Sequence, residues 1–107
     1  MSYYGINDLD RKKLADGVHI QVMPGDRMMM VFYSIDAGGV IPMHSHPHEQ
    51  MGMVLEGSIE LDIDGVRRSV SPGDAYHVRS NVPHGGKAGD EPVRVVEVFS
   101  PPREDFL

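Results

Sequence analysis

The chain of 107 residues is long enough for one domain with its own hydrophobic core and too short for two. A formal net charge of -6 without a basic patch makes nucleic acid and anionic membrane surfaces unfavourable partners. Cysteine is absent, so there is neither a disulfide framework nor a thiolate, and any bound metal must be held by histidine and oxygen ligands.

The first 17 residues contain turn and capping residues, among them Asn7, Asp8 and Asp16, with too little apolar periodicity to predict a helix. We therefore expect residues 1–17 to form an N-terminal arm and residues 18–107 to form the domain. No basic region followed by an apolar run occurs here, and no stretch approaches the length needed to span a bilayer. These features predict a cytoplasmic protein without a membrane partner.

From residue 18 onward, short segments rich in β-favouring residues alternate with turns that contain glycine, proline and aspartate. In the clearest segment, 58–64, apolar and polar residues alternate strictly, and Asp64-Gly65 then predicts a hairpin. Residues 81–86 indicate a turn. The expected strands are 18–23, 28–35, 40–46, 51–55, 58–64, 66–70, 75–78 and 93–99. Short, evenly spaced strands predict a single all-β domain, either a sandwich or a barrel.

Three of the six histidines and a glutamine lie within the eight residues from Met43 to Gln50. On an extended strand His44 and His46 point to the same face, close enough to bind one ion, and Gln50 has the same parity. Imidazole suits Zn, Cu, Fe and Ni, and an oxygen ligand from Gln50 extends the choice towards Mn. The alternative is a polar loop with solvated histidines, but the i, i+2 pair with a polar partner after it favours a metal site.

The spacing of these residues resembles two sequence motifs of the cupins. The first comprises Gly38, five residues, His44-x-His46-x-x-x-Gln50, and six residues to Gly57, with Gln where Glu is usual. The second comprises Gly65, Ser71-Pro72-Gly73-Asp74 and Val82-Pro83-His84, with its proline one place late at Pro72. The resemblance implies a cupin jelly-roll β-barrel, or double-stranded β-helix, that holds one divalent transition metal (Ni, Mn, Fe or Zn). The ligands that it implies are His44, His46, Gln50 and His84.

The C-terminal segment Glu97-Val98-Phe99-Ser100-Pro101-Pro102-Arg103 and the cluster at 44–50 are together similar to the small cupins of the pectin degradation protein type. Members of that group convert unsaturated monouronates, released by polysaccharide lyases, into linear deoxy-keto-uronates. The resemblance implies catalytic roles for Glu97 and Arg103. Glu97 stands where that group has Asp, which keeps the carboxylate but adds one methylene.

The charge of the implied ligands predicts the kind of substrate. Three neutral imidazoles and the neutral Gln50 would leave the charge of a divalent ion uncompensated, which makes it a stronger Lewis acid. Such an ion favours a small anionic substrate rich in oxygen. Four protein ligands also leave open positions on an ion that accepts five or six.

Ketonisation needs a titratable group near the metal but not bound to it, and Glu97 is the candidate. Strand alternation puts Glu97 on one face with Val95 and Phe99, so Glu97 points inward if Phe99 is buried. In the alternative, Val96 and Val98 form the buried face and Glu97 lies in solvent.

Several other side chains have a less definite role. Arg103 could bind a substrate carboxylate through two hydrogen bonds, or it could pair with Glu104, Asp105 or another chain. His48 is expected at the rim of the site rather than on the metal, because Pro47 distorts the strand. Surface or packing roles are expected for His19 and His77, and pocket-lining roles are possible for Tyr33 and Tyr76.

Two other functions fit the same features. A metal-dependent dioxygenase would use iron to bind oxygen and a chelating substrate, and a non-catalytic cupin would bind a small ligand without turnover. Barrels of this size often pair through edge strands or sheet faces, so we expect a homodimer.

Overall fold

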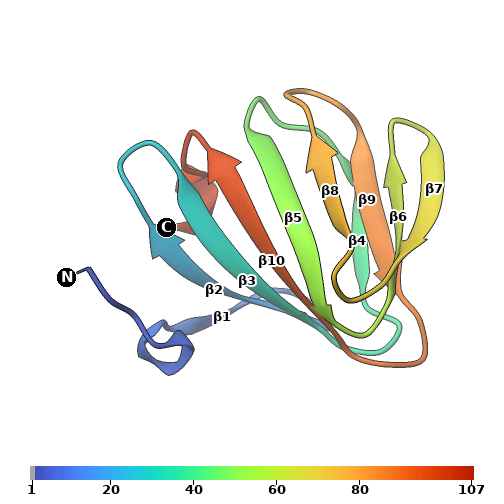
Figure 1. Ribbon diagram of the computed structural model, residues 1–107, viewed down its shortest axis with the longest axis horizontal. Coiled ribbons are helices and arrows are strands. Elements are labelled where there is room, and N and C mark those ends of the chain that lie inside the picture. Colours follow the sequence, from blue (N-terminus) through green and yellow to red (C-terminus); the bar gives the residue numbers. More distant parts are fainter. Residues whose placement is uncertain (1) are drawn as a thin grey trace.

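The computed structural model describes residues 2–107, which form ten strands in two antiparallel sheets (Figure 1). The larger sheet has the order β1 (Arg11–Ala15), β2 (Val18–Pro24), β3 (Met29–Ile35), β10 (Val93–Ser100), β5 (Glu49–Glu56) and β8 (Ala75–Val78). The smaller sheet has the order β4 (Val40–His44), β9 (His84–Ala88), β6 (Ile59–Ile63) and β7 (Val66–Val70). Two short 3-10 segments, η1 (Ile6–Asp8) and η2 (Glu104–Phe106), lie near the chain ends. The predicted all-β fold is confirmed.

The core lies between the two sheets and follows the alternation of the strands. Every second residue of β3 and of β10 is buried, and the residues between them are half-buried on the opposite face. Buried residues of β2, β5, β6, β7 and β9 complete the interior, which also contains Phe106 of η2. The interior therefore receives the odd-numbered side chains of β10, including that of Glu97.

Residues 11–15 of the expected arm form an edge strand, β1, which pairs with β2 from Arg11↔Gln21 to Ala15↔Val18. All five residues of β1 are exposed. A strand that buries none of its side chains carries no apolar alternation, so no local pattern predicts it. Neither 3-10 segment of residues 2–107 is long and apolar enough to cross a membrane.

The prediction of a turn at 81–86 was wrong for its second half, because His84–Ala88 form β9 in the interior of the smaller sheet. Glycine is depleted in strands, which hid this one. Here the glycines allow close packing: a Cβ on Gly85 would lie 2.8 Å from the carbonyl oxygen of Ile41, and one on Gly86 would lie 2.8 Å from Cδ2 of Leu61. The missing side chains thus let β9 fit between β4 and β6.

Strand register brings distant parts of the chain to one end of the interior. His44 pairs with His84 across β4 and β9. On the facing sheet, Gln50 of β5 pairs with Phe99 of β10, and Gly52 of β5 pairs with Glu97. The residues singled out in the sequence therefore face one another across the two sheets.

Candidate metal centre

Three imidazoles converge at this end of the interior. His44 ends β4, His46 lies in the following loop and His84 begins β9. One ring nitrogen from each can be chosen so that all three lie within 4.8 Å of one another. Two nitrogens that are each about 2.1 Å from one ion lie at most about 4.2 Å apart, so a small inward movement of the rings would complete the contact.

The expectation that His44 and His46 share a strand face was wrong, because β4 ends at His44. The loop that follows contains Pro47, which cannot donate to a ladder. A backbone hydrogen bond of 2.8 Å from the N–H of Asn81 to the carbonyl of His46 fixes this loop. Gln50 also lies on a different strand, β5, so its approach to the site comes from the larger sheet.

Each of the three rings is oriented by a backbone carbonyl. Nδ1 of His44 contacts the oxygen of Pro42 at 2.8 Å, Nδ1 of His46 contacts that of His48 at 3.0 Å, and Nδ1 of His84 contacts that of Val82 at 2.8 Å. A carbonyl can only accept, so each Nδ1 carries the proton. Every Nε2 is then left with a lone pair, the form that binds a metal.

Buried polar atoms that lack a hydrogen-bond partner indicate whether the site suits an ion. Within residues 2–107, Nε2 of His46, Nε2 of His84 and Oε1 of Gln50 are buried without a hydrogen-bond partner. Buried acceptors without partners are costly, and one cation would satisfy all three. The donor set of imidazole nitrogens and an amide oxygen suits a divalent transition metal. The residues present therefore fit an ion held by His44, His46, Gln50 and His84.

Burial also sets the protonation of the rings. Desolvation lowers the pKa of His84 to about 4, and it lowers the pKa of His46, with a further contribution from the charge of Arg103. Both imidazoles are therefore neutral at pH 7. A metal ion need not displace a proton from either ring.

Glu97 lies inward beside this cluster and is only 8% exposed. Its Oε2 accepts a hydrogen bond of 2.8 Å from Nε2 of Gln50 and one of 2.6 Å from the hydroxyl of Tyr76. Burial raises the pKa of Glu97, and the hydrogen bonds from Tyr76, Gln50 and Tyr33, together with the charge of Arg103, act in the opposite direction. The bonds from Gln50 and Tyr76 both end on Oε2, so Oε1 is the carboxylate oxygen that neither of them engages.

A cavity of about 310 Å³ opens between the sheets at this site. Such a volume lies near the lower end of the range for small-molecule pockets. Apolar side chains line most of the wall, and polar groups gather where the ligands lie. The polar lining residues are Tyr33, His44, Gln50, Tyr76, His84, Glu97, Arg103 and Asp105.

Arg103 reaches the cavity but already has a partner. Its Nη2 and Nε contact the carboxylate of Asp105 at 2.8 Å and 3.3 Å, and its guanidinium lies 4.0 Å from the centre of the Phe106 ring. The hydrogen bond from Arg103 lowers the pKa of Asp105. Asp105, one of the alternative partners expected for Arg103, therefore binds it. The third guanidinium nitrogen, Nη1, takes part in neither of these two contacts.

The remaining histidines do not belong to the cluster of three converging imidazoles. His48 supports the site through its carbonyl oxygen, which contacts the ring of His46. His77 is exposed and contacts Glu49 at 2.6 Å. Sequence parity could not place Tyr76, whose hydroxyl contacts Glu97. The signal that could have found it is Gly52, a glycine in the middle of a strand, since such a position often marks a close approach.

Comparison with known proteins places this architecture in a family. The family model described as "Cupin domain" matches residues 31–99, which include all four candidate ligands. The chain belongs to the cupin family. The prediction made from the two motifs is confirmed, and the fold is the expected cupin barrel of two antiparallel sheets.

Similar proteins match this cupin over nearly its full length. The pectin degradation protein KdgF of Dickeya dadantii (strain 3937) is 33% identical over 107 residues, covering 98% of this chain and 97% of that protein. The solved structure of KdgF from Halomonas sp. has a TM-score of 0.93 at 30% identity and covers 100% of this chain and 99% of its own. An RmlC-like cupin from Shewanella frigidimarina NCIMB 400 has a TM-score of 0.94 at 27% identity, with 100% and 96% covered. The predicted likeness to the pectin degradation type is confirmed.

The ligand set predicts how metal affinity responds to substitution. The unmodified cupin should bind about one divalent ion per chain. His84→Ala should weaken binding by more than about 100-fold, because loss of a ligand costs more than loss of an outer hydrogen-bond partner. Isothermal titration with Ni²⁺ or Zn²⁺ measures both. His77→Ala, an exposed histidine outside the cluster, is the matched control and should bind as the unmodified chain does. Equal affinity in His84→Ala would contradict the assignment.

Proposed function

We propose that this cupin converts unsaturated monouronates into linear keto acids with the help of one divalent metal ion, Ni, Mn, Fe or Zn. The observation that carries the proposal is a buried carboxylate, Glu97, placed inside the cavity beside a ligand set that bears no negative charge. The likeness to the pectin degradation protein KdgF supports it, because the products of pectin breakdown include uronates with a double bond. The proposed substrate is therefore a small anion.

The bound ion would supply Lewis acidity to the substrate carboxylate and the oxygen next to it. His44, His46, His84 and Gln50 would hold that ion without neutralising its charge. The cavity would hold the sugar ring, and its apolar wall would exclude water from the reacting atoms.

The reaction balances without an oxidant or a second substrate. The unsaturated ring has a double bond between C4 and C5, and C5 carries both the ring oxygen and the carboxylate. Loss of the proton from the anomeric hydroxyl forms the C1 aldehyde as the bond from C1 to the ring oxygen breaks, which leaves an enolate at C5. Addition of one proton to C4 then gives the C5 ketone. The net change is cleavage of the bond from C1 to the ring oxygen, with movement of one proton from oxygen to carbon.

Glu97 is the group proposed to carry that proton. Its Oε2 is occupied by the hydrogen bonds from Gln50 and Tyr76, so Oε1 is the atom proposed to exchange a proton with the substrate. A carboxylate held at one oxygen by these two donors can exchange a proton at its other oxygen, first as base and then as acid.

Replacement of Glu97 by Gln tests the role of the carboxylate. The amide keeps the shape and can still accept from Gln50 and Tyr76, so metal content should remain near one ion per chain. The value of kcat should fall by about 100-fold or more, since general acid–base catalysis contributes about 10²- to 10⁴-fold. In the assay, unsaturated galacturonate is incubated with the metal-loaded protein, and the loss of its ultraviolet absorbance is followed. Oxygen uptake is recorded in parallel. Unchanged turnover in Glu97→Gln would remove Glu97 from the reaction, and stoichiometric oxygen uptake would indicate a dioxygenase instead.

Arg103 is proposed to bind the substrate carboxylate with the part of its guanidinium that Asp105 leaves free. Lysine keeps the charge but loses the planar fork and the stacking on Phe106. Arg103→Lys should therefore raise KM about tenfold and leave kcat nearly unchanged, because the lost contact serves binding throughout the reaction. Arg94→Lys is the matched control, since Arg94 is on β10 and pairs with Glu56 at 3.7 Å. An unaltered KM in Arg103→Lys would assign Arg103 to the pair with Asp105 alone.

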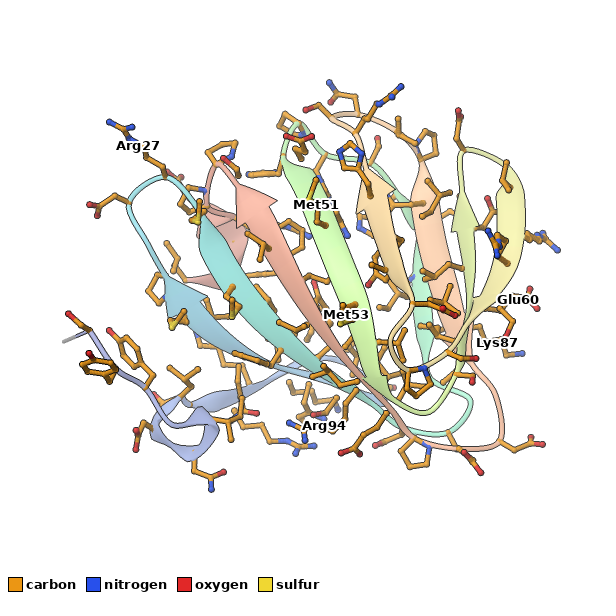
Figure 2. All side chains as sticks on the ribbon, in the orientation of Figure 1. Arg27, Met51, Met53, Glu60, Lys87 and Arg94 are labelled. Atoms are coloured by element: carbon orange, nitrogen blue, oxygen red, sulfur yellow. The ribbon has the colours of Figure 1, made fainter. Side chains whose placement is uncertain are left out.

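We also propose that two copies of the chain pair through the outer face of the larger sheet. Met51 and Met53, 56% and 42% exposed, lie on β5, where Figure 2 labels them. They pair in register with Val98 and Val96 of β10, which are half-buried, so the apolar surface continues across both strands. An apolar patch of this kind can pack against the same patch of a second copy about a twofold axis.

Light scattering tests the pairing. The mass in solution should be twice the chain mass of 11.8 kDa. Met53→Glu should shift the mass towards that of one chain at the same concentration, because it buries a charge in the proposed interface. Val66→Glu, at an exposed position on β7 of the smaller sheet, is the control and should leave the mass unchanged. A monomeric mass for the unmodified chain would refute the pairing.

A further inference from the structure

Glu97, Gly52 and Tyr76 form one row across three neighbouring strands. Glu97 of β10 pairs with Gly52 of β5, and Gly52 pairs with Tyr76 of β8. Neighbouring strands lie about 4.8 Å apart, so the backbones of β10 and β8 are separated by roughly twice that distance. Tyr76 must therefore extend across β5 for its hydroxyl to lie 2.6 Å from Oε2 of Glu97.

The missing side chain of Gly52 provides the path. A Cβ on Gly52 would lie 2.5 Å from both Cζ and the hydroxyl oxygen of Tyr76, and 2.8 Å from Cε2. The inward residues on either side of Gly52 in β5, Gln50 and Val54, are both buried, so the gap is confined to one position of the strand. Any larger residue at 52 would displace the ring of Tyr76 from Glu97.

The row ends on the oxygen that also orients a metal ligand. Oε2 of Glu97 accepts from Tyr76 and, at 2.8 Å, from Nε2 of Gln50. Burial and the nearby Glu97 carboxylate raise the pKa of Tyr76, so its hydroxyl stays protonated and donates. With Nε2 held by Glu97, the amide oxygen of Gln50 is the atom directed away from Glu97, and it is buried without a partner within the described residues 2–107.

We propose that Tyr76, seated in the gap at Gly52, is a positioning residue that fixes the carboxylate of Glu97 and, through it, the orientation of the Gln50 amide towards the metal. Without the hydroxyl, Glu97 gains freedom to rotate, and the amide of Gln50 can turn its Nε2–H groups towards the ion. The effect on the metal is independent of the substrate. The effect on catalysis, through Oε1 of Glu97, rests on the proposed function.

Two variants disturb the row in different ways. Tyr76→Phe removes the hydroxyl and keeps the ring, and Gly52→Ala keeps the hydroxyl and displaces the ring. Each should weaken Co²⁺ binding about tenfold, the lower end of the range for outer hydrogen-bond partners of metal ligands. Each should also alter the visible absorption of the Co²⁺-loaded protein, since the oxygen ligand is disturbed. Affinity is measured by competition with a chromophoric chelator, and circular dichroism checks that each variant folds.

Matched controls exist for both changes. Tyr4→Phe removes the hydroxyl of an exposed tyrosine. Gly89→Ala adds a Cβ that would meet no heavy atom within 4 Å among residues 2–107. Both controls should reproduce the affinity and the spectrum of the unmodified chain.

The double variant separates positioning from general destabilisation. If Gly52 acts through the hydroxyl of Tyr76, then Gly52→Ala in the Tyr76→Phe background should weaken Co²⁺ binding by less than about twofold further. Fully multiplicative effects would overturn the proposal, and so would unchanged affinity and spectrum in Tyr76→Phe. If Gly52→Ala does not fold, Tyr76→Phe alone decides.

The measurement of Co²⁺ binding needs no substrate, so it tests the positioning role even if the chain does not turn over uronates. In that case the proposed function fails and the positioning role stands or falls on Co²⁺ binding. If the chain is active, Tyr76→Phe should lower kcat with little change in KM, because Oε1 of Glu97 is less well placed for proton transfer.

Discussion

The site depends on one buried carboxylate that is held by neutral hydrogen-bond donors. Glu97 lies in the interior and receives the amide of Gln50 and the hydroxyl of Tyr76 on a single oxygen. A buried charge without such bonds would be expelled or neutralised. The two donors therefore make it possible to keep an acid inside an apolar cavity, and they also fix its position.

This constraint explains the glutamine in a motif that usually has glutamate. The side chain at position 50 faces Glu97 through Nε2, and its Oε1 is buried without a hydrogen-bond partner among residues 2–107. An amide can donate to a carboxylate and offer an oxygen to a cation at the same time. A glutamate at 50 would place two carboxylates within hydrogen-bond distance, and one of them would have to take up a proton. Gln50 and Glu97 are thus a matched pair.

The sequence allowed prediction of residues whose placement follows from local rules. Strand alternation correctly put Glu97 on the buried face with Val95 and Phe99, and the motif spacing singled out the three converging imidazoles. The exposed β1 and the glycine-containing β9 could not be predicted, because neither shows the alternation that marks a strand. Gly52 indicates a close approach within β5, but the sequence alone does not identify Tyr76 as the side chain that makes it. The role of Tyr76 depends on which strands are neighbours and on the gap at Gly52. The register between strands that are distant in sequence cannot be predicted from the local residue pattern.

The formal charges around the cavity limit what it can bind. Arg103 is offset by Asp105, and none of the four candidate ligands brings a negative charge. A divalent ion together with an ionised Glu97 would leave one net positive charge in a cavity of about 310 Å³. One substrate carboxylate would cancel that charge, whereas a second anionic group would have to lie in the apolar part of the wall at considerable cost. Charge and volume together therefore favour a single uronate over a longer fragment with two carboxylates, which agrees with the proposed action on the monomeric products of polysaccharide cleavage.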